Sequence, residues 1–312
     1  MQPHTPHPTQ PQIAFGKAAL AAALALLLWS GAPIQAQRDW SQVQIKTIKV
    51  APGVHMLQGA GGNIGVSSGD DGVVLIDDQF APLTDKIKAA VAEISDQPIR
   101  FVLNTHWHSD HTGGNENFGK ANTLIVAHDN VRRRMAAGGV VDYFQSDNPP
   151  APKDALPVVT FDQTVTFHLN GDEVHAFHVP PAHTDGDSII HLRKANVVHM
   201  GDLYFNGMYP FIDYSSGGSI DGVIHGVEKV LAMADDKTQI IPGHGPLSNR
   251  AELTAYRDML RGVRDAIAPL VEAGKTLEEV VAAKPTAPFD EKWAKGFIPP
   301  EGFCKIVYNT LK

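Results

Sequence analysis

The sequence predicts an α/β fold, a layered sandwich in which helices cover two packed sheets. Three observations lead to this prediction. Short apolar runs with strand character occur in both halves of the chain, amphipathic helical repeats lie between them, and clusters of strands alternate with single helices. A chain of 312 residues is long enough to bury one large core and to carry extensions.

The first half of the folded region begins with strands. Apolar runs broken by Gly and Asn predict them at residues 48–50, 54–57, 63–66 and 72–77. Pro82 then opens a helix, because the apolar side chains from Leu83 to Ile94 recur on one face. A buried strand at 99–103, a strand at 123–127 and a helix at 130–137 follow.

The second half repeats this alternation. Residues 147–157 are rich in proline and predict an irregular surface loop. Asn170-Gly171 is the strongest short hairpin signal in the chain, and it joins two predicted strands. The predicted strands of this half lie at 164–169, 173–179, 188–192, 196–200 and 239–241, with a helix at 220–233.

Two further helices are predicted toward the C-terminus. A long amphipathic helix begins near Ser248, which we expect to be its N-cap. Thr276 and Glu279 form a capping box for one more short helix.

Residues 104–111 have the sequence N-T-H-W-H-S-D-H, which is dense in metal-ligand side chains. Zinc and similar divalent ions prefer imidazole and carboxylate ligands, and core packing hardly explains such a cluster. In an extended chain His106 and His108 face one way, whereas Asp110 and His111 come from the turn that follows. Together with ligands from elsewhere, these donors exceed the needs of one tetrahedral ion and favour a two-metal site.

Three further candidate ligands each follow an apolar strand at a turn marked by Gly or Pro. His183 lies in Pro-Ala-His-Thr-Asp-Gly-Asp, Asp202 in His-Met-Gly-Asp, and His244 in Pro-Gly-His-Gly-Pro. Loops at strand ends carry function more often than other segments do, so we expect these side chains to point into one shared site.

These separated motifs, taken in order, resemble the metallo-β-lactamase superfamily of hydrolases. The resemblance covers roughly residues 50–246, because the segments around Asn63 and Asp77 are similar to the family's opening strands. It implies a four-layer αββα sandwich with the metal site along one edge. Residues 37–312 would then form the metallo-β-lactamase-like hydrolase domain, with a C-terminal helical extension from about residue 248.

The resemblance also implies a ligand set. It assigns His106, His108 and His183 to one ion, Asp110, His111 and His244 to a second ion, and Asp202 to both. We therefore expect two Zn2+ per chain, with Fe or Mn as possible replacements. Asp110 would also be catalytic, orienting the attacking water and later passing a proton. Asp77 is expected either to support a ligand or to be a structural hydrogen-bond acceptor.

The function implied is metal-assisted hydrolysis of a small-molecule substrate. A dinuclear metal-bound hydroxide would open an ester, lactone, thioester or β-lactam-type cyclic amide bond. One large group of β-lactamases uses a cysteine ligand, and the single cysteine here, Cys304, lies far from the motifs. Two alternatives stay open: a non-haem iron enzyme like the sulfur dioxygenases of the superfamily, and a metal-binding accessory protein without catalysis.

Two aromatic segments are candidates for lining the substrate site. They are Met208-Tyr209-Pro210-Phe211 and the loop around Tyr143-Phe144. Either segment could line a partly apolar pocket or serve in simple packing. No nucleic-acid partner is expected, because the net charge is −8 and the longest basic run is three arginines, residues 132–134, in a predicted helix.

The N-terminus has the pattern of an export signal. The stretch from Ala18 to Trp29 is apolar without interruption, and small residues lead up to Ala36. We therefore predict a signal peptide at residues 1–36, a periplasmic or secreted protein, and no stable membrane association after cleavage. An uncleaved membrane anchor is the alternative. A lone Cys304 excludes an intramolecular disulfide.

Overall fold

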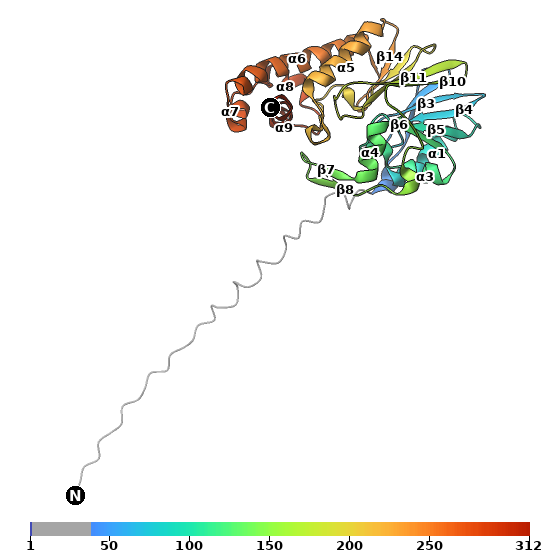
Figure 1. Ribbon diagram of the computed structural model, residues 1–312, viewed down its shortest axis with the longest axis horizontal. Helices are drawn as coiled ribbons and strands as arrows, with labels where there is room; N and C mark the ends of the chain where they lie inside the picture. The colour runs from blue at the N-terminus through green and yellow to red at the C-terminus, as the bar shows by residue number, and fades with distance from the viewer. Residues whose placement is uncertain (2–38) are drawn as a thin grey trace. The chain divides into compact units, whose positions relative to one another are not determined.

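Two β-sheets flanked by helices make up the computed structural model, which describes Met1 and residues 39–312 (Figure 1). Apart from Met1, the predicted signal peptide lies outside the described residues. The first sheet has the strand order β1-β2-β3-β4-β5-β6-β9. Its strands are β1 (Lys46–Ala51), β2 (Val54–Gln58), β3 (Ile64–Gly69), β4 (Gly72–Ile76), β5 (Ile99–Leu103), β6 (Leu124–His128) and β9 (Val159–Phe161).

The second sheet has the order β10-β11-β12-β13-β14-β15. Its strands are β10 (Thr164–Leu169), β11 (Asp172–His178), β12 (Ser188–Leu192), β13 (Val197–His199), β14 (Gln239–Ile241) and β15 (Ser248–Asn249). A separate hairpin pairs β7 (Gly139–Val141) with β8 (Ser146–Asn148).

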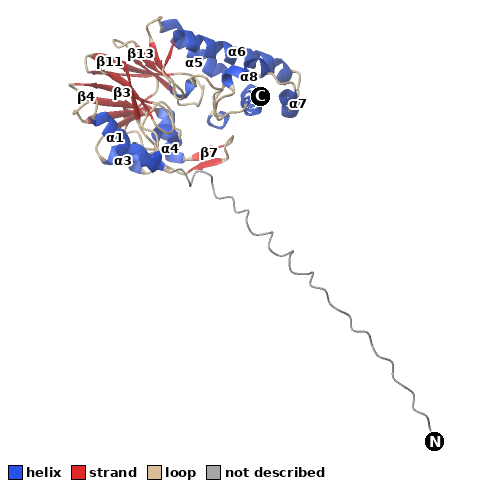
Figure 2. Ribbon diagram, turned by 180° about the vertical axis from the view of Figure 1, so that it is seen from behind, coloured by secondary structure: helices blue, strands red, loops and turns tan. Residues whose placement is uncertain are grey.

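Helices lie on the outer side of each sheet, and Figure 2 shows them in blue on either side of the red strands. Those of the first half are α1 (Thr84–Ala92), α2 (Ser109–Thr112), α3 (Asn115–Lys120) and α4 (Asp129–Ala137). Those of the second half are α5 (Ile220–Met233), α6 (Arg250–Glu272), α7 (Leu277–Ala282), α8 (Ala287–Trp293) and α9 (Pro300–Leu311). None of the helices in the described part of the chain combines the length and apolar character needed to cross a membrane.

Three buried clusters fill the three spaces between these layers. Leu75 of β4 packs with Ile87 of α1 between the first sheet and its helices. Its neighbour Ile76 packs with Val174 of β11 between the two sheets. Val227 of α5 belongs to the third cluster, which fills the space between the second sheet and its helices. Because successive strand residues face opposite sides, one strand supplies two of these spaces, and the predicted αββα sandwich is confirmed.

Most predicted elements are present within a few residues of their expected limits. Asn170 and Gly171 have φ of 56° and 68°, as a type I′ hairpin turn requires. The capping box of Thr276 and Glu279 is confirmed at the start of α7. A 3-10 helix that includes Pro82 precedes α1.

The predicted N-cap of the long helix is wrong by one residue. Asn249 caps α6, because its side chain accepts a hydrogen bond from Glu252 N at 3.1 Å. Ser248 belongs to β15, and its hydroxyl is engaged with Tyr204 Oη at 2.7 Å and Glu252 Oε2 at 2.8 Å. The proline-rich loop is only partly irregular, because β8 ends at Asn148 inside it.

Candidate metal centre

The ends of two pairs of parallel strands bring the predicted ligands together. In the first sheet, β4 and β5 are parallel, and residues 104–111 follow β5. In the second sheet, β13 and β14 are parallel, with Asp202 after one strand and His244 after the other. Parallel neighbours end at the same edge, so residues distant in sequence meet there.

All seven predicted ligands gather in two groups at this edge. The first group is His106, His108, His183 and Asp202, and the second is Asp110, His111 and His244. Within each group the candidate ligand atoms all lie within 4.8 Å of one another. Trp107 points elsewhere, as alternation predicts: it packs in the third core cluster and donates to Ser216 Oγ at 3.1 Å.

The Asp202 carboxylate lies between the two groups. Its Oδ2 is 3.6 Å from His183 Nε2 and 3.3 Å from His244 Nε2. Its Oδ1 is 3.0 Å from His111 Nε2. The side chain is only 5% exposed, so these polar groups lie close together in a site shielded from water. The carboxylate thus lies against histidines of both groups, as a bridging ligand would.

Asp77 orients two of the histidines. Its Oδ2 lies 2.7 Å from His111 Nδ1 and also accepts a hydrogen bond from the Thr105 hydroxyl at 2.7 Å. The Thr105 hydroxyl in turn lies 3.0 Å from His106 Nδ1. The Nε2 atoms of His106 and His111 therefore point into the centre. His111 Nε2 faces Asp202 Oδ1 at 3.0 Å, and His106 Nε2 has no hydrogen-bond partner among the described residues. A buried imidazole nitrogen left without a partner fits a missing metal ion.

His108 and His183 are held in the same way from the other side. Asp213 Oδ2 lies 2.9 Å from His108 Nε2, and Phe211 O lies 2.9 Å from His183 Nδ1. The opposite ring nitrogens, His108 Nδ1 and His183 Nε2, approach each other at 2.9 Å. Asp187 fixes the turn around His183, because its Oδ2 accepts from the His183 backbone N at 2.6 Å.

Glycines let the backbone approach the centre closely. A Cβ on Gly62 would stand 2.1 Å from the His111 ring, and one on Gly243 would stand 2.0 Å from Asp202 Oδ1. Neither distance is compatible with a side chain. Gly62 and Gly243 are therefore required, because no larger residue fits beside His111 and Asp202.

The pKa values of the buried groups suit metal ligands. Burial is the largest influence on His106 and lowers its pKa well below the ordinary value. Burial also lowers the pKa of His183, to about 4. Both imidazoles are therefore neutral at neutral pH, the form in which histidine binds a metal.

The carboxylates and the two histidines of the second group are coupled by charge. Burial by itself would raise the pKa of Asp110, but the nearby His111 and His244 lower it to about 2. Burial would also lower the pKa of His244, but Asp202 and Asp110 raise it to about 9. Without an ion, protonated imidazoles balance the carboxylates, and a divalent cation would take over that role.

Sequence reasoning missed some residues that build this site. Asp213 stands in no metal-ligand motif of the sequence; it supports His108 and also accepts a hydrogen bond from Ser216 N at 3.2 Å. Thr105 and Asp187 stand inside the motifs, but the sequence pattern alone predicts no role for them. Phe297, from the loop between α8 and α9, lies 6.1 Å from His244 between ring centroids.

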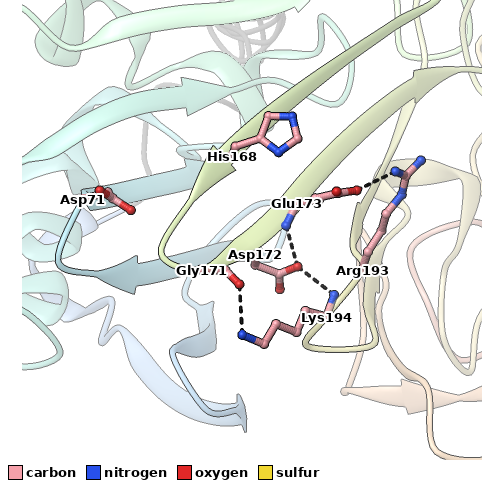
Figure 3. A pocket seen from close by; sticks show the side chains of 7 residues that line it. All are labelled: Asp71, His168, Gly171, Asp172, Glu173, Arg193 and Lys194. Carbon is pink, nitrogen blue, oxygen red and sulfur yellow. Dashed lines mark hydrogen bonds and ion pairs between the residues drawn. The ribbon is translucent and has the colours of Figure 1, made fainter.

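A polar pocket also lies away from the metal centre, but its carboxylates are already engaged in hydrogen bonds and an ion pair. Figure 3 shows it at the β10–β11 turn, lined by Asp71, His168, Gly171, Asp172, Glu173, Arg193 and Lys194. Asp172 Oδ1 accepts from Lys194 N at 2.7 Å, and Glu173 Oε2 pairs with Arg193 at 2.7 Å (Figure 3). These carboxylates are already used to hold the turns of the second sheet.

Comparison with known proteins agrees with the geometry. A sequence model of the metallo-beta-lactamase superfamily matches residues 58–244. A hydroxyacylglutathione hydrolase from Polaromonas sp. (strain JS666 / ATCC BAA-500) is 27% identical over 199 residues, which are 61% of this chain and 65% of that protein. The chain thus matches slightly less than two thirds of that relative.

Solved structures share the fold at low sequence identity. The sec-alkylsulfatase Pisa1 from Pseudomonas sp. is 19% identical with a TM-score of 0.64, covering 85% of this chain and 50% of that one. The metallo-beta-lactamase FIM-1 from Pseudomonas aeruginosa, solved in a mono-zinc form, is 20% identical with a TM-score of 0.56, covering 70% and 96%. With the family match spanning more than half of its length, this chain belongs to the metallo-beta-lactamase superfamily.

Proposed function

We propose that the protein is a hydrolase that uses two zinc ions to open an ester, lactone, thioester or cyclic amide bond of a small molecule. One observation carries this proposal: the two groups of ligand atoms share the Asp202 carboxylate. His106, His108 and His183 would hold one ion, and Asp110, His111 and His244 would hold the other. The donor set, imidazole and carboxylate without thiolate, suits zinc and also admits iron or manganese.

The bound ions would supply a water of lowered pKa and polarise the scissile bond. The chain's own residues would position the reactants. Asp110 is the most exposed of the seven, at 26%, and its pKa of about 2 keeps it ionised at neutral pH. As an ionised carboxylate it can accept a hydrogen bond from the attacking water and orient it. Its passing a proton to the leaving group is a further part of this proposal. Its Oδ2 lies 3.4 Å from His244 Nε2, which limits its rotation.

The hydrolytic reaction is supported by the family and by the relative named a hydroxyacylglutathione hydrolase. The substrate within that class is a proposal from the bond types that such a centre can cleave. A glutathione thioester suits an exported protein poorly, so we place esters and lactones first.

Metal analysis and a substrate panel test the proposal together. The purified protein should contain about two zinc ions per chain and hydrolyse at least one ester, lactone, thioester or β-lactam. A single iron with oxygen uptake on a persulfide would point to an oxygenase instead. Metal-loaded protein that hydrolyses nothing on the panel would favour a non-catalytic metal-binding role.

Replacing Asp110 by Ala tests its role. We expect turnover to fall by at least about a hundredfold, a typical contribution of a positioned acid or base, with part of the metal lost. Full activity at unchanged metal content would exclude the role of Asp110 in handling water.

We also propose export with cleavage after Ala36. Mass spectrometry of the protein from a periplasmic extract should show a chain beginning at Gln37. A protein in that extract that still begins at Met1 would contradict cleavage.

A further inference from the structure

Three phenylalanine rings span the metal centre from His108 to His244. We call Phe211, Phe144 and Phe297 the aromatic arc. Phe211 lies 5.8 Å from His108, and Phe144 lies 4.7 Å from Phe211. Phe297 lies 6.3 Å from Phe144 and 6.1 Å from His244, all between ring centroids. The arc therefore joins a ligand of the first group to a ligand of the second.

Two rings of the arc are unusually exposed. Phe144 is 47% and Phe297 is 53% exposed, whereas Phe211 is 5% exposed. Exposed apolar rings cost free energy in water, and adjacent ones mark surfaces that bind a partner or ligand. Asp110 and His244, the most exposed of the seven ligands, are 26% and 17% exposed. The exposed ring of Phe297 thus lies beside His244, one of the two ligands that solvent reaches.

Packing holds the Phe144 side of the arc in place. Phe144 lies in the β7–β8 turn, and its backbone N donates a hydrogen bond to Val141 O at 3.2 Å, which closes the turn. Its neighbour Tyr143 packs so closely on α9 that a Cβ on Gly302 would stand 2.2 Å from the tyrosine hydroxyl.

Hydrogen bonds and burial hold the segment around Phe297 in place as well. Tyr209 donates its backbone N to Trp293 O at 2.9 Å and its hydroxyl to Asp290 Oδ1 at 2.8 Å. Ile298, next to Phe297, is fully buried. Phe297 lies beyond residues 58–244, so the C-terminal helices bring to the centre a side chain outside the region matched by the family.

We propose that Phe144 and Phe297 form a substrate subsite that binds an aromatic group attached to the scissile bond. Aromatic rings pack on one another edge to face or offset, and the two exposed rings offer such surfaces. Phe297 lies 6.1 Å from His244, and Phe144 packs on Phe211, which lies 5.8 Å from His108. A group bound between the two exposed rings therefore lies close to the bond being cleaved. The proposal rests on the hydrolase function and names its substrate class: neutral esters or lactones that carry an aromatic ring.

The kinetic experiment compares methyl phenylacetate with methyl acetate, which differ by one ring. In the zinc-loaded enzyme the ratio of their kcat/KM values measures selectivity. We expect Phe297→Ala and Phe144→Ala each to lower this ratio about tenfold, the scale of a lost apolar contact in a specificity site. Phe297→Trp should keep the ratio high. Leu124→Ala, which removes an apolar side chain 44% exposed on β6, is the control and should leave the ratio unchanged.

A binding experiment separates this subsite from the reaction. Calorimetry with phenylacetate and acetate should show tighter binding of phenylacetate to the zinc-loaded wild-type protein, and Phe297→Ala should remove most of the difference. If no ester is cleaved but this binding pattern holds, the hydrolase proposal fails and the aromatic subsite stands. If esters are cleaved but both Phe variants keep wild-type selectivity and binding, the subsite is overturned and the function stands.

Discussion

The Asp213 carboxylate lies 2.9 Å from His108 Nε2 across 105 residues of sequence. Asp213 is 1% exposed. Burial alone would raise the pKa of Asp213, but its hydrogen bonds with His108 and with the serines after it hold that pKa below the ordinary range. An ionised carboxylate at this distance fixes the ring and directs Nδ1 toward the first group of ligands.

Replacing Asp213 by Asn should weaken the first metal position. Asn keeps a carbonyl that can accept from Ser216 N, so the local turn is preserved, but the negative charge of the carboxylate beside His108 Nε2 is lost. We expect zinc affinity to fall about 10- to 100-fold, the usual cost of losing such a partner. Competition titration with a chromophoric chelator measures it. Asp142→Asn, at an exposed position near the same segment, is the control and should bind zinc like the wild type.

Replacing Asp77 by Asn should weaken zinc binding at the second metal position, which includes His111. Asp77 holds His111 Nδ1 at 2.7 Å and has a φ of 65°, a backbone conformation that Asn also tolerates. We therefore expect the variant to fold and to lose mainly the second ion, so that zinc per chain drops from about two toward one at limiting zinc. Two full-affinity ions in this variant would show that Asp77 has a purely structural role.

The sequence alone predicts much of the fold and all seven candidate ligands, because local rules govern them. Period-two apolar runs and the Asn170-Gly171 turn define strands, and ligand side chains follow strand ends. The hairpin of β7 and β8 was missed, because three residues per strand are too few for a periodic signal. The N-cap shift from Ser248 to Asn249 depends on Tyr204, which binds the Ser248 hydroxyl from a distant loop.

The residues that support the ligands were harder to predict than the ligands. Asp213 and Phe297 act through spatial contacts with residues more than 50 positions away, and neither stands in a motif with metal chemistry. The sequence leaves packing and pocket lining open for Tyr143 and Phe144: Tyr143 packs on α9, while Phe144 is 47% exposed, and its place in a pocket stays a prediction.

Replacing Gly243 by Ala should disrupt the bridging carboxylate. The new Cβ would stand 2.0 Å from Asp202 Oδ1 and 2.6 Å from Gly201 O, so either the carboxylate or the backbone must move. We expect the free energy of unfolding to fall by about 1–3 kcal/mol, as overpacking usually causes, and zinc binding to weaken at both positions. Urea unfolding and zinc titration measure the two effects. Gly139→Ala is the matched control, since its Cβ would meet nothing closer than 3.9 Å. Equal behaviour of the two variants would contradict the steric argument.

Acid should destabilise the fold through a histidine pair outside the metal centre. His128 and His178 stack with ring centroids 3.8 Å apart. Burial lowers the pKa of both, and for His128 the charge of His178 lowers it further. Because the folded protein binds these protons less readily than the unfolded chain does, the pair's contribution to stability is complete above the ordinary pKa of 6.5 and is lost as the pH falls below it.

The variant His178→Gln tests this pH dependence. Gln can still donate a hydrogen bond toward Asp187 O, which His178 Nδ1 approaches at 2.9 Å, but it does not titrate. We expect the free energy of unfolding of the metal-free protein to fall less between pH 7.5 and pH 5.5 in this variant than in the wild type, since one proton-linked group is gone. Urea unfolding at the two pH values measures it, and using metal-free protein prevents acid release of zinc from contributing. His168→Gln, on an exposed position of β10, should leave the wild-type pH dependence in place. If the free energy of unfolding of His178→Gln falls with pH as steeply as that of the wild type, the stacked pair does not control acid stability.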